Sequence, residues 1–138
     1  MENQKFTDVV NEQVEICLNM LISKNDHYNP AEDKLQSFKK AAHLEGITQA
    51  QALRGMMAKH TVSIYDMINS GQKYSMAQWD EKITDHINYL LLLKAVVVEE
   101  QGEDALALLR EKLMSVPKTE VVADFPKTNY DPRTREYI

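Results

Sequence analysis

The sequence predicts an all-α protein, a single-domain bundle of four to five helices with an extended C-terminal tail. The 138-residue chain contains only four glycines and four prolines, and three of the prolines lie beyond residue 116. The stretch before that point is rich in Ala, Leu, Met, Lys, Glu and Gln, which favour helices. Its apolar residues recur at helical spacing, and no strand-like alternation precedes the tail.

These patterns divide the chain into a helical bundle domain over residues 1–115 and an extended or partly disordered tail over residues 116–138. A chain of this length, 43% hydrophobic, can bury one core without disulfide bonds. The tail contains three of the four prolines and little periodicity. Its apolar residues Val121, Val122 and Phe125 predict packing on the bundle or on a neighbouring subunit.

The first two helices are predicted over residues 7–23 and 31–44. The stripe expected to face the core in the first helix is Val10, Val14, Cys17 and Leu21, with Ile16 and Met20 beside it. A loop over residues 24–30 separates the two helices, because Asn, Asp and Pro disfavour helix continuation. Gly46 is expected to end the second helix.

Three further helices are predicted, two of them from their N-caps. Thr48 is a good N-cap for a helix that runs to Asn69. Ser75 with Gln78 forms a capping box for a fourth helix, which ends at residues 101–102. A fifth helix is expected over residues 103–114, and the leucines expected to face inward are Leu106, Leu109 and Leu113.

The charge and composition exclude several classes of function. A net charge of −5 and a pI of about 5.4 argue against general binding to a nucleic-acid backbone. The single cysteine, Cys17, excludes a disulfide framework and a cysteine-based zinc site, and it lies on an apolar stripe where a buried thiol is expected. The polar N-terminus is not a signal peptide, and the longest apolar stretch, residues 90–98, falls short of the ~20 residues that span a bilayer. We therefore expect a cytoplasmic protein with no membrane partner.

The fourth helix contains the most distinctive polar row of the chain. Glu81, Asp85 and Asn88 follow one another at spacings of four and three, which places them on one helix face. The row continues through apolar residues, so it predicts oxygen ligands pointing into a cleft. Glu81 and Asp85 suit Mg²⁺. The alternative is a polar row at the end of the bundle, with Glu81 solvated and Asp85 bonded to a neighbouring cation.

Further candidate ligand-binding residues lie on the third helix and in the first loop. His60 lies within an apolar stripe, and antiparallel packing of the third and fourth helices would bring it near Asp85 or Asn88, where a carboxylate would raise its basicity. The alternative is a core histidine. The groups suited to phosphate and base contacts are Lys24, His27 and Tyr28 in the loop, and Arg54 and Lys59 on the third helix. An ordinary loop and solvated cations are the alternatives there.

Four segments together resemble a known group of proteins. They are Lys24-Asn25-Asp26-His27-Tyr28, Phe38 with Ala41-Ala42, Met56-Met57-Ala58-Lys59-His60 with Ser63-Ile64, and Glu81-Lys82-Ile83-Thr84-Asp85 with Asn88-Tyr89-Leu90. In this order they resemble small helical proteins of phages and prophages of Gram-positive bacteria, and more distantly the phage nucleotide-modification-associated helical domain. The positions of this chain that match the motifs of the group, and that the resemblance therefore implies as site residues, are Lys24, Asp26, Tyr28, Lys59, His60, Glu81, Asp85, Asn88 and Tyr89. The chain departs from the distant group at Asn29, where that group usually has Gly.

A second resemblance is to the MazG-like all-α nucleotide pyrophosphatases, which bind Mg²⁺ with paired acidic motifs. Glu12 and Glu15 match half of that motif in their spacing. Glu81 and Asp85 are the second element, spaced by one residue more than in those enzymes and lying further along the chain. The alternative for Glu12 and Glu15 is a solvated helix face.

The resemblances imply a phage or prophage nucleotide-binding protein that acts in nucleotide metabolism or nucleotide-signal recognition in the host cytoplasm. One alternative is a Mg²⁺-dependent MazG-like nucleotide pyrophosphatase. The other is a non-catalytic phage accessory protein that captures a host protein or a signalling nucleotide. The expected partners are a nucleotide or nucleotide-like small molecule and a second copy of the chain in a homo-oligomer, because the long apolar fourth helix and the tail offer surface to cover.

Overall fold

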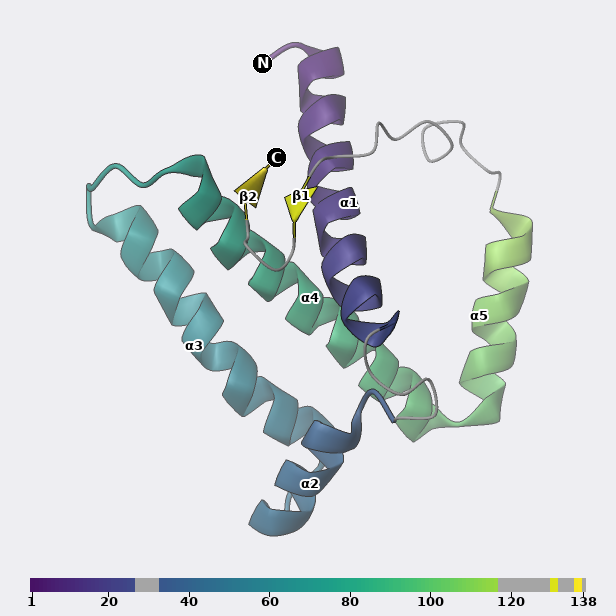
Figure 1. Cartoon of the computed structure of the whole chain (residues 1–138). Coiled ribbons are helices and arrows are strands. Elements are labelled where there is room, and N and C mark those ends of the chain that lie inside the picture. The colour runs from purple at the N-terminus through teal and green to yellow at the C-terminus, as the bar shows by residue number, and fades with distance from the viewer. Residues whose placement is uncertain (27–32, 117–129, 132–135, 138) are drawn as a thin grey trace.

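The computed structural model describes residues 1–26, 33–116, 130–131 and 136–137, and it is an all-α bundle, as predicted (Figure 1). Its helices are α1 (Asn3–Asp26), α2 (Gln36–Glu45), α3 (Gln49–Asn69), α4 (Met76–Gln101) and α5 (Glu103–Ser115). In the tail, β1 (Tyr130–Asp131) and β2 (Glu136–Tyr137) pair in antiparallel register. The rest of the predicted tail beyond residue 116 lies outside the described residues.

Local sequence signals account for most of the helix boundaries. Thr48 and Ser75 both form capping boxes, in which the hydroxyl accepts from the backbone N–H three residues on and that residue's side chain accepts from the cap. Gly46 ends α2 with a φ of 65°. The second helix begins five residues later than predicted, because the Asp33 carboxylate accepts a hydrogen bond from the Leu35 backbone N–H and holds a turn there. The first helix extends beyond its predicted range at both ends.

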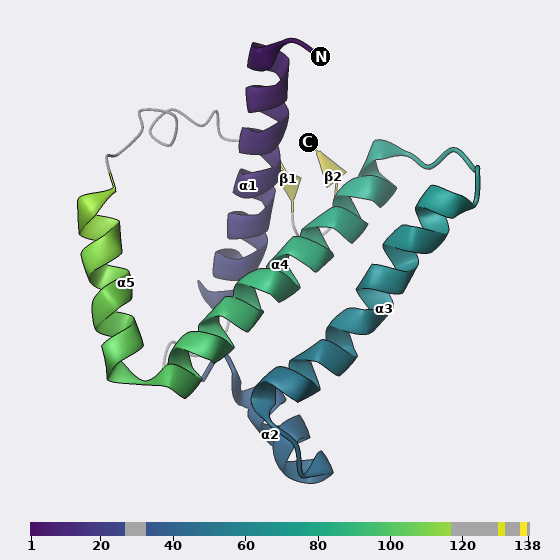
Figure 2. The ribbon, with the colours of Figure 1, turned by 180° about the vertical axis from the view of Figure 1, so that it is seen from behind.

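The long helix α4 is the centre of the arrangement. Figures 1 and 2 show α3 and α4 side by side and antiparallel, with α1 crossing α4 and α2 lying at the lower end of α3. The helix α5 leaves the C-terminal end of α4 after Gly102, whose φ of 78° permits the sharp change of direction. Every other helix except α2 therefore packs mainly on α4, and α2 packs on α3.

The hydrophobic core lies where α2, the first half of α3 and the second half of α4 meet. Its buried members are Leu35, Phe38, Leu53 and Val96, and the half-buried residues packed against it include Met56, Met57, Tyr89, Leu92 and Leu93. Lys39 on α2 forms two ion pairs. Its Nζ lies 2.7 Å from Glu99 Oε1 at the end of α4 and 2.6 Å from Asp33 Oδ2, which precedes α2. Both hydrogen bonds raise the pKa of Lys39, and the one with Asp33 has the larger effect.

The face that α1 buries differs from the predicted one. Ile16, Cys17 and Met20 are buried, whereas Val10 and Val14 remain 42% and 44% exposed. The reason is a polar contact with α4: Gln13 Nε2 donates to Thr84 Oγ1 at 2.8 Å, which turns the face containing Gln13 toward α4. Cys17 is buried, as predicted, and desolvation raises the pKa of its thiol.

The apolar surfaces of α4 and α5 are also less buried than predicted. On α4, Leu90 and Leu91 are 48% and 43% exposed, although the helix is apolar on nearly every side. On α5, Leu106 and Leu109 are half-buried, Leu113 is 69% exposed, and no residue is fully buried. No helix among the described residues has the length and hydropathy needed to cross a membrane.

Candidate functional site

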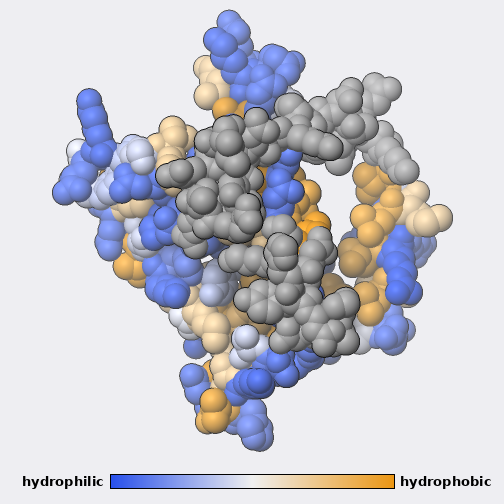
Figure 3. Space-filling model, in the orientation of Figure 1, coloured by the Kyte–Doolittle hydropathy of each residue, from blue (hydrophilic) through white to orange (hydrophobic). Residues whose placement is uncertain are grey.

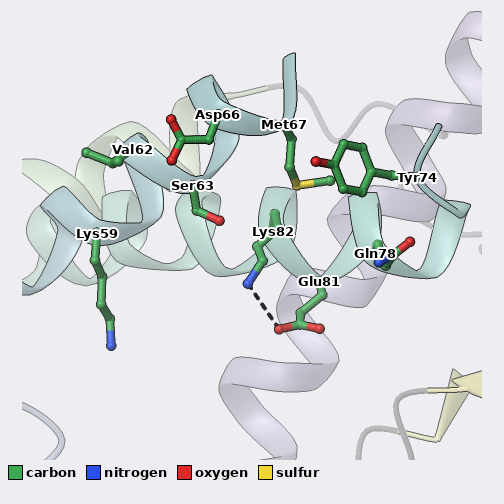
Figure 4. A pocket seen from close by; sticks show the side chains of 9 residues that line it. All are labelled: Lys59, Val62, Ser63, Asp66, Met67, Tyr74, Gln78, Glu81 and Lys82. Carbon is green, nitrogen blue, oxygen red and sulfur yellow. Dashed lines mark hydrogen bonds and ion pairs between the residues drawn. The ribbon is translucent and has the colours of Figure 1, made fainter. Parts of the chain in front are cut away.

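A pocket of about 510 Å³ lies between the second half of α3 and the first half of α4 (Figure 4). Pockets of 300–1,000 Å³ hold most small-molecule ligands. The residues that line it are Lys59, Val62, Ser63, Asp66, Met67, Tyr74, Gln78, Glu81 and Lys82. The pocket therefore combines two lysines and two carboxylates with an aromatic ring, a thioether, a hydroxyl and an amide.

The antiparallel hairpin of α3 and α4 brings these side chains together. Lys59 and Tyr74 lie toward opposite ends of the pocket, with Lys82 between them. Lys82 Nζ lies 3.4 Å from Glu81 Oε1 on the pocket wall. Tyr74 is held by two neighbours: its hydroxyl lies 3.1 Å from Ser70 Oγ, and its ring meets Trp79 edge-on at a centroid distance of 5.9 Å. Its ring is therefore positioned before any ligand binds.

His60 lies beside Asp85, one residue along α3 from the pocket residue Lys59. His60 Nδ1 and Asp85 Oδ2 are 3.7 Å apart, which confirms the predicted approach of these two residues. Their side chains are 14% and 24% exposed. The His60 ring also contacts the Tyr89 ring at a centroid distance of 4.8 Å.

The Asp85 carboxylate raises the pKa of His60, as predicted, but the net shift of this pKa is downward. Burial lowers the pKa of His60 below its ordinary value of 6.5, and Lys59, Lys82 and His86 lower it further. Asp85 raises it, but less than burial lowers it. The geometry resembles an ion pair, but burial lowers the pKa of His60 and so favours its neutral form.

Asn88 is buried in α4, on the same helix face as the buried Thr84. Only 6% of Asn88 is exposed, and its Oδ1 has no hydrogen-bond partner within the described residues. Asn88 does not line the pocket. The polar row therefore divides along its length: Glu81 faces the pocket, Asp85 meets His60, and Asn88 lies in the interior.

The donors predicted to bind a metal are the carboxylates of Glu81 and Asp85. They are one turn apart on α4, and Glu81 also lies against Lys82. No group of three or more His, Cys, Asp or Glu side chains suited to a metal occurs in the part of the chain that the structure describes. Two carboxylates are compatible with Mg²⁺ only if water and ligand phosphate supply the remaining ligands, as is usual for this ion.

The remaining predicted site residues are those of the first loop and Arg54. His27 and Tyr28 lie outside the described residues, as does the side chain of Lys24. Arg54 is exposed on α3 and does not line the pocket. Of the four predicted ligand-binding residues whose side chains the structure describes, Lys59 lines the pocket, whereas Arg54, His60 and Asn88 do not.

Sequence reasoning did not assign Asp66, Tyr74, Gln78 and Lys82 to the site. The helical repeat contained part of the signal, because Val62, Ser63, Asp66 and Met67 follow Lys59 at spacings of three, four, seven and eight. Pairing that face with the first turns of the next helix predicts the pocket. Tyr74 lies in the connection between the helices and has no periodic signal.

In comparisons with known proteins, no family model, no curated protein and no solved structure matches the chain. The relationship to phage helical proteins and to MazG-like pyrophosphatases therefore stays a prediction from the sequence. The function has to be argued from the pocket.

Proposed function

We propose that the pocket between α3 and α4 binds a nucleotide or nucleotide-like molecule. The observation that carries this proposal is the placement of two lysines and a fixed tyrosine ring in one pocket of about 510 Å³. Lysine ammonium groups bind phosphate as point charges, and an aromatic face stacks on a base. Ser63 and Gln78 supply hydrogen-bonding groups for the sugar or the base edge.

The charges of the pocket suggest that a divalent cation assists binding. Asp66 and Glu81 balance Lys59 and Lys82, so a phosphate group entering the pocket meets no net positive charge. Mg²⁺ held by Glu81, with Asp85 one turn further along, would neutralise the carboxylate that now lies against Lys82. Lys82 would then be available to the phosphate.

The same arrangement supports a second candidate function, a Mg²⁺-dependent nucleotide pyrophosphatase. It is favoured by the position of Glu81 in the pocket wall and of Asp85 one turn further along α4. Bound Mg²⁺ would polarise phosphoryl oxygens. On this reading Asp85 serves as a metal ligand, with His60 Nδ1 3.7 Å from its Oδ2.

A nucleotide-binding assay tests the first proposal. The purified chain is titrated with nucleoside mono-, di- and triphosphates by calorimetry, in Mg²⁺ or in EDTA. We expect at least one nucleotide to bind, with higher affinity in Mg²⁺. Lys59→Ala and Lys82→Ala should each weaken binding roughly ten-fold or more, because a charge-assisted hydrogen bond contributes about 1.5–3 kcal/mol. Lys40→Ala, an exposed lysine on α2, is the matched control.

Product analysis of the same mixtures separates the two candidates. Release of pyrophosphate or phosphate that needs Mg²⁺ and disappears in Asp85→Asn would support the pyrophosphatase. Binding without product would support a non-catalytic nucleotide-binding protein. No binding across the panel, or equal binding by Lys82→Ala and Lys40→Ala, would contradict the assignment of this pocket and favour the accessory protein that captures a host partner.

A further inference from the structure

One side of α1 is an exposed ridge of branched apolar residues. Val10, Val14, Leu18 and Ile22 follow one another every four residues and are 42–55% exposed. Residues at this spacing form the ridge that interdigitates in the commonest class of helix packing. Aligned on one helix, four such side chains make a continuous apolar strip rather than scattered surface hydrophobes.

A complementary groove lies at the junction of α4 and α5. It has a volume of about 170 Å³, and its lining combines apolar with polar residues: Val97, Val98, Ala105, Leu108 and Leu109 with Lys94, Gln101 and Lys112. Leu108 in this groove is 58% exposed. The groove therefore offers apolar side chains for packing together with two positive charges.

The ridge and the groove match in charge as well as in hydropathy. The apolar strip of α1 is bordered along the helix by Asp8 and Glu15, which lie on the neighbouring face. Positive groups at the groove and negative groups beside the ridge favour this pairing over a contact of ridge with ridge.

The ridge and the groove lie apart within one molecule. Figure 3 shows an open gap between α1 and α5, with hydrophobic surface on the side of α5 that faces the gap.

We propose that two copies of the chain form a two-fold dimer in which the α1 ridge of each copy packs into the α4–α5 groove of the other. Two-fold symmetry repeats the contact, so each copy buries both its ridge and its groove. The reciprocal contact covers the apolar strip of α1 and adds a packing partner for α5, which packs mainly on α4 within the described chain.

Mass measurement of the full chain in solution, by light scattering after size exclusion, tests the dimer. We expect twice the chain mass for the wild type, and at least a ten-fold rise in the dimer dissociation constant for Val14→Glu and for Leu18→Glu. Ile68→Glu, at a 63% exposed position on α3, is the matched control and should remain dimeric. Circular dichroism checks that each variant keeps its helices. A monomeric wild type, or a control that dissociates like Leu18→Glu, overturns the proposal.

Cross-linking tests the pairing of ridge with groove. A variant with both Leu18→Cys and Leu108→Cys, treated with a short bismaleimide, should give a product of dimer mass, while the native Cys17 is buried. The Leu18→Cys single variant should give little dimer product. Efficient dimer formation by that single variant would mean ridge against ridge, and a link within one chain would mean that α5 closes on its own α1. Either result overturns the reciprocal arrangement.

Discussion

The part of the molecule where α2, α3 and the second half of α4 meet contains a cluster of buried apolar side chains, whereas α5 buries none completely. Both regions contain leucines at helical spacing, and α1 adds its exposed valines. The difference lies in the neighbours. Leu53 belongs to a core assembled from three helices, while α5 packs mainly on α4 among the described elements. A hydrophobic pattern therefore predicts an apolar face without saying whether this chain or another copy covers it.

The largest difference between the two regions should appear in leucine truncations. Leu53 is 0% exposed and Leu113 is 69% exposed. Leu53→Ala should lower the free energy of unfolding by about 2–5 kcal/mol, because it removes buried area and leaves a cavity. Leu113→Ala should change it by less than about 0.5 kcal/mol. Urea denaturation of both variants measures this, and equal losses would show that α5 is as well packed as the core.

Helix caps should have the next largest effect. Ser75 closes a capping box at the start of α4, on which most of the fold packs, whereas α5 starts at Gly102 with no side-chain cap. Ser75→Ala should cost about 1 kcal/mol of stability. Ser37→Ala, at an exposed helical position on α2, is the matched control and should be nearly neutral. If only Ser37→Ala lost stability, the expected contribution of the Ser75 cap would be contradicted.

The smallest effect should be the pH dependence contributed by His60. Its pKa is lowered in the folded state, so the unfolded state takes up the proton first as the pH falls. The stability associated with neutral His60 is present above its ordinary pKa of 6.5 and is lost as the pH falls toward the lower, folded value. In His60→Gln the loss of stability between neutral and mildly acidic pH should be smaller than in the wild type.

Chemical denaturation across this pH range measures the effect, and His43→Gln provides the control because His43 is exposed on α2. If His60→Gln made the protein more sensitive to acid, the charged pair with Asp85 would be stabilising. The desolvation argument for His60 would then be wrong.

Part of the candidate site could be predicted from the sequence, and part could not. The row of Glu81 and Asp85 and the approach of His60 to Asp85 followed from helical spacing and from the short connection between the third and fourth helices. Tyr74 was not predicted, since it lies in that connection and carries no periodic signal. The effect of Asp85 on the pKa of His60 was predicted with the right sign, but the burial that outweighs it was not predicted.

The fold class, the caps at Thr48 and Ser75 and the ends of most helices are readable in the sequence, because capping and helix propensity act between residues a few positions apart. The face that α1 buries was decided only in the tertiary structure. Gln13 and Thr84 are 71 residues apart in the chain, and their hydrogen bond turns Ile16 and Met20 inward. Val10 and Val14 stay exposed as a result, since burial depends on which distant side chains meet across a helix contact.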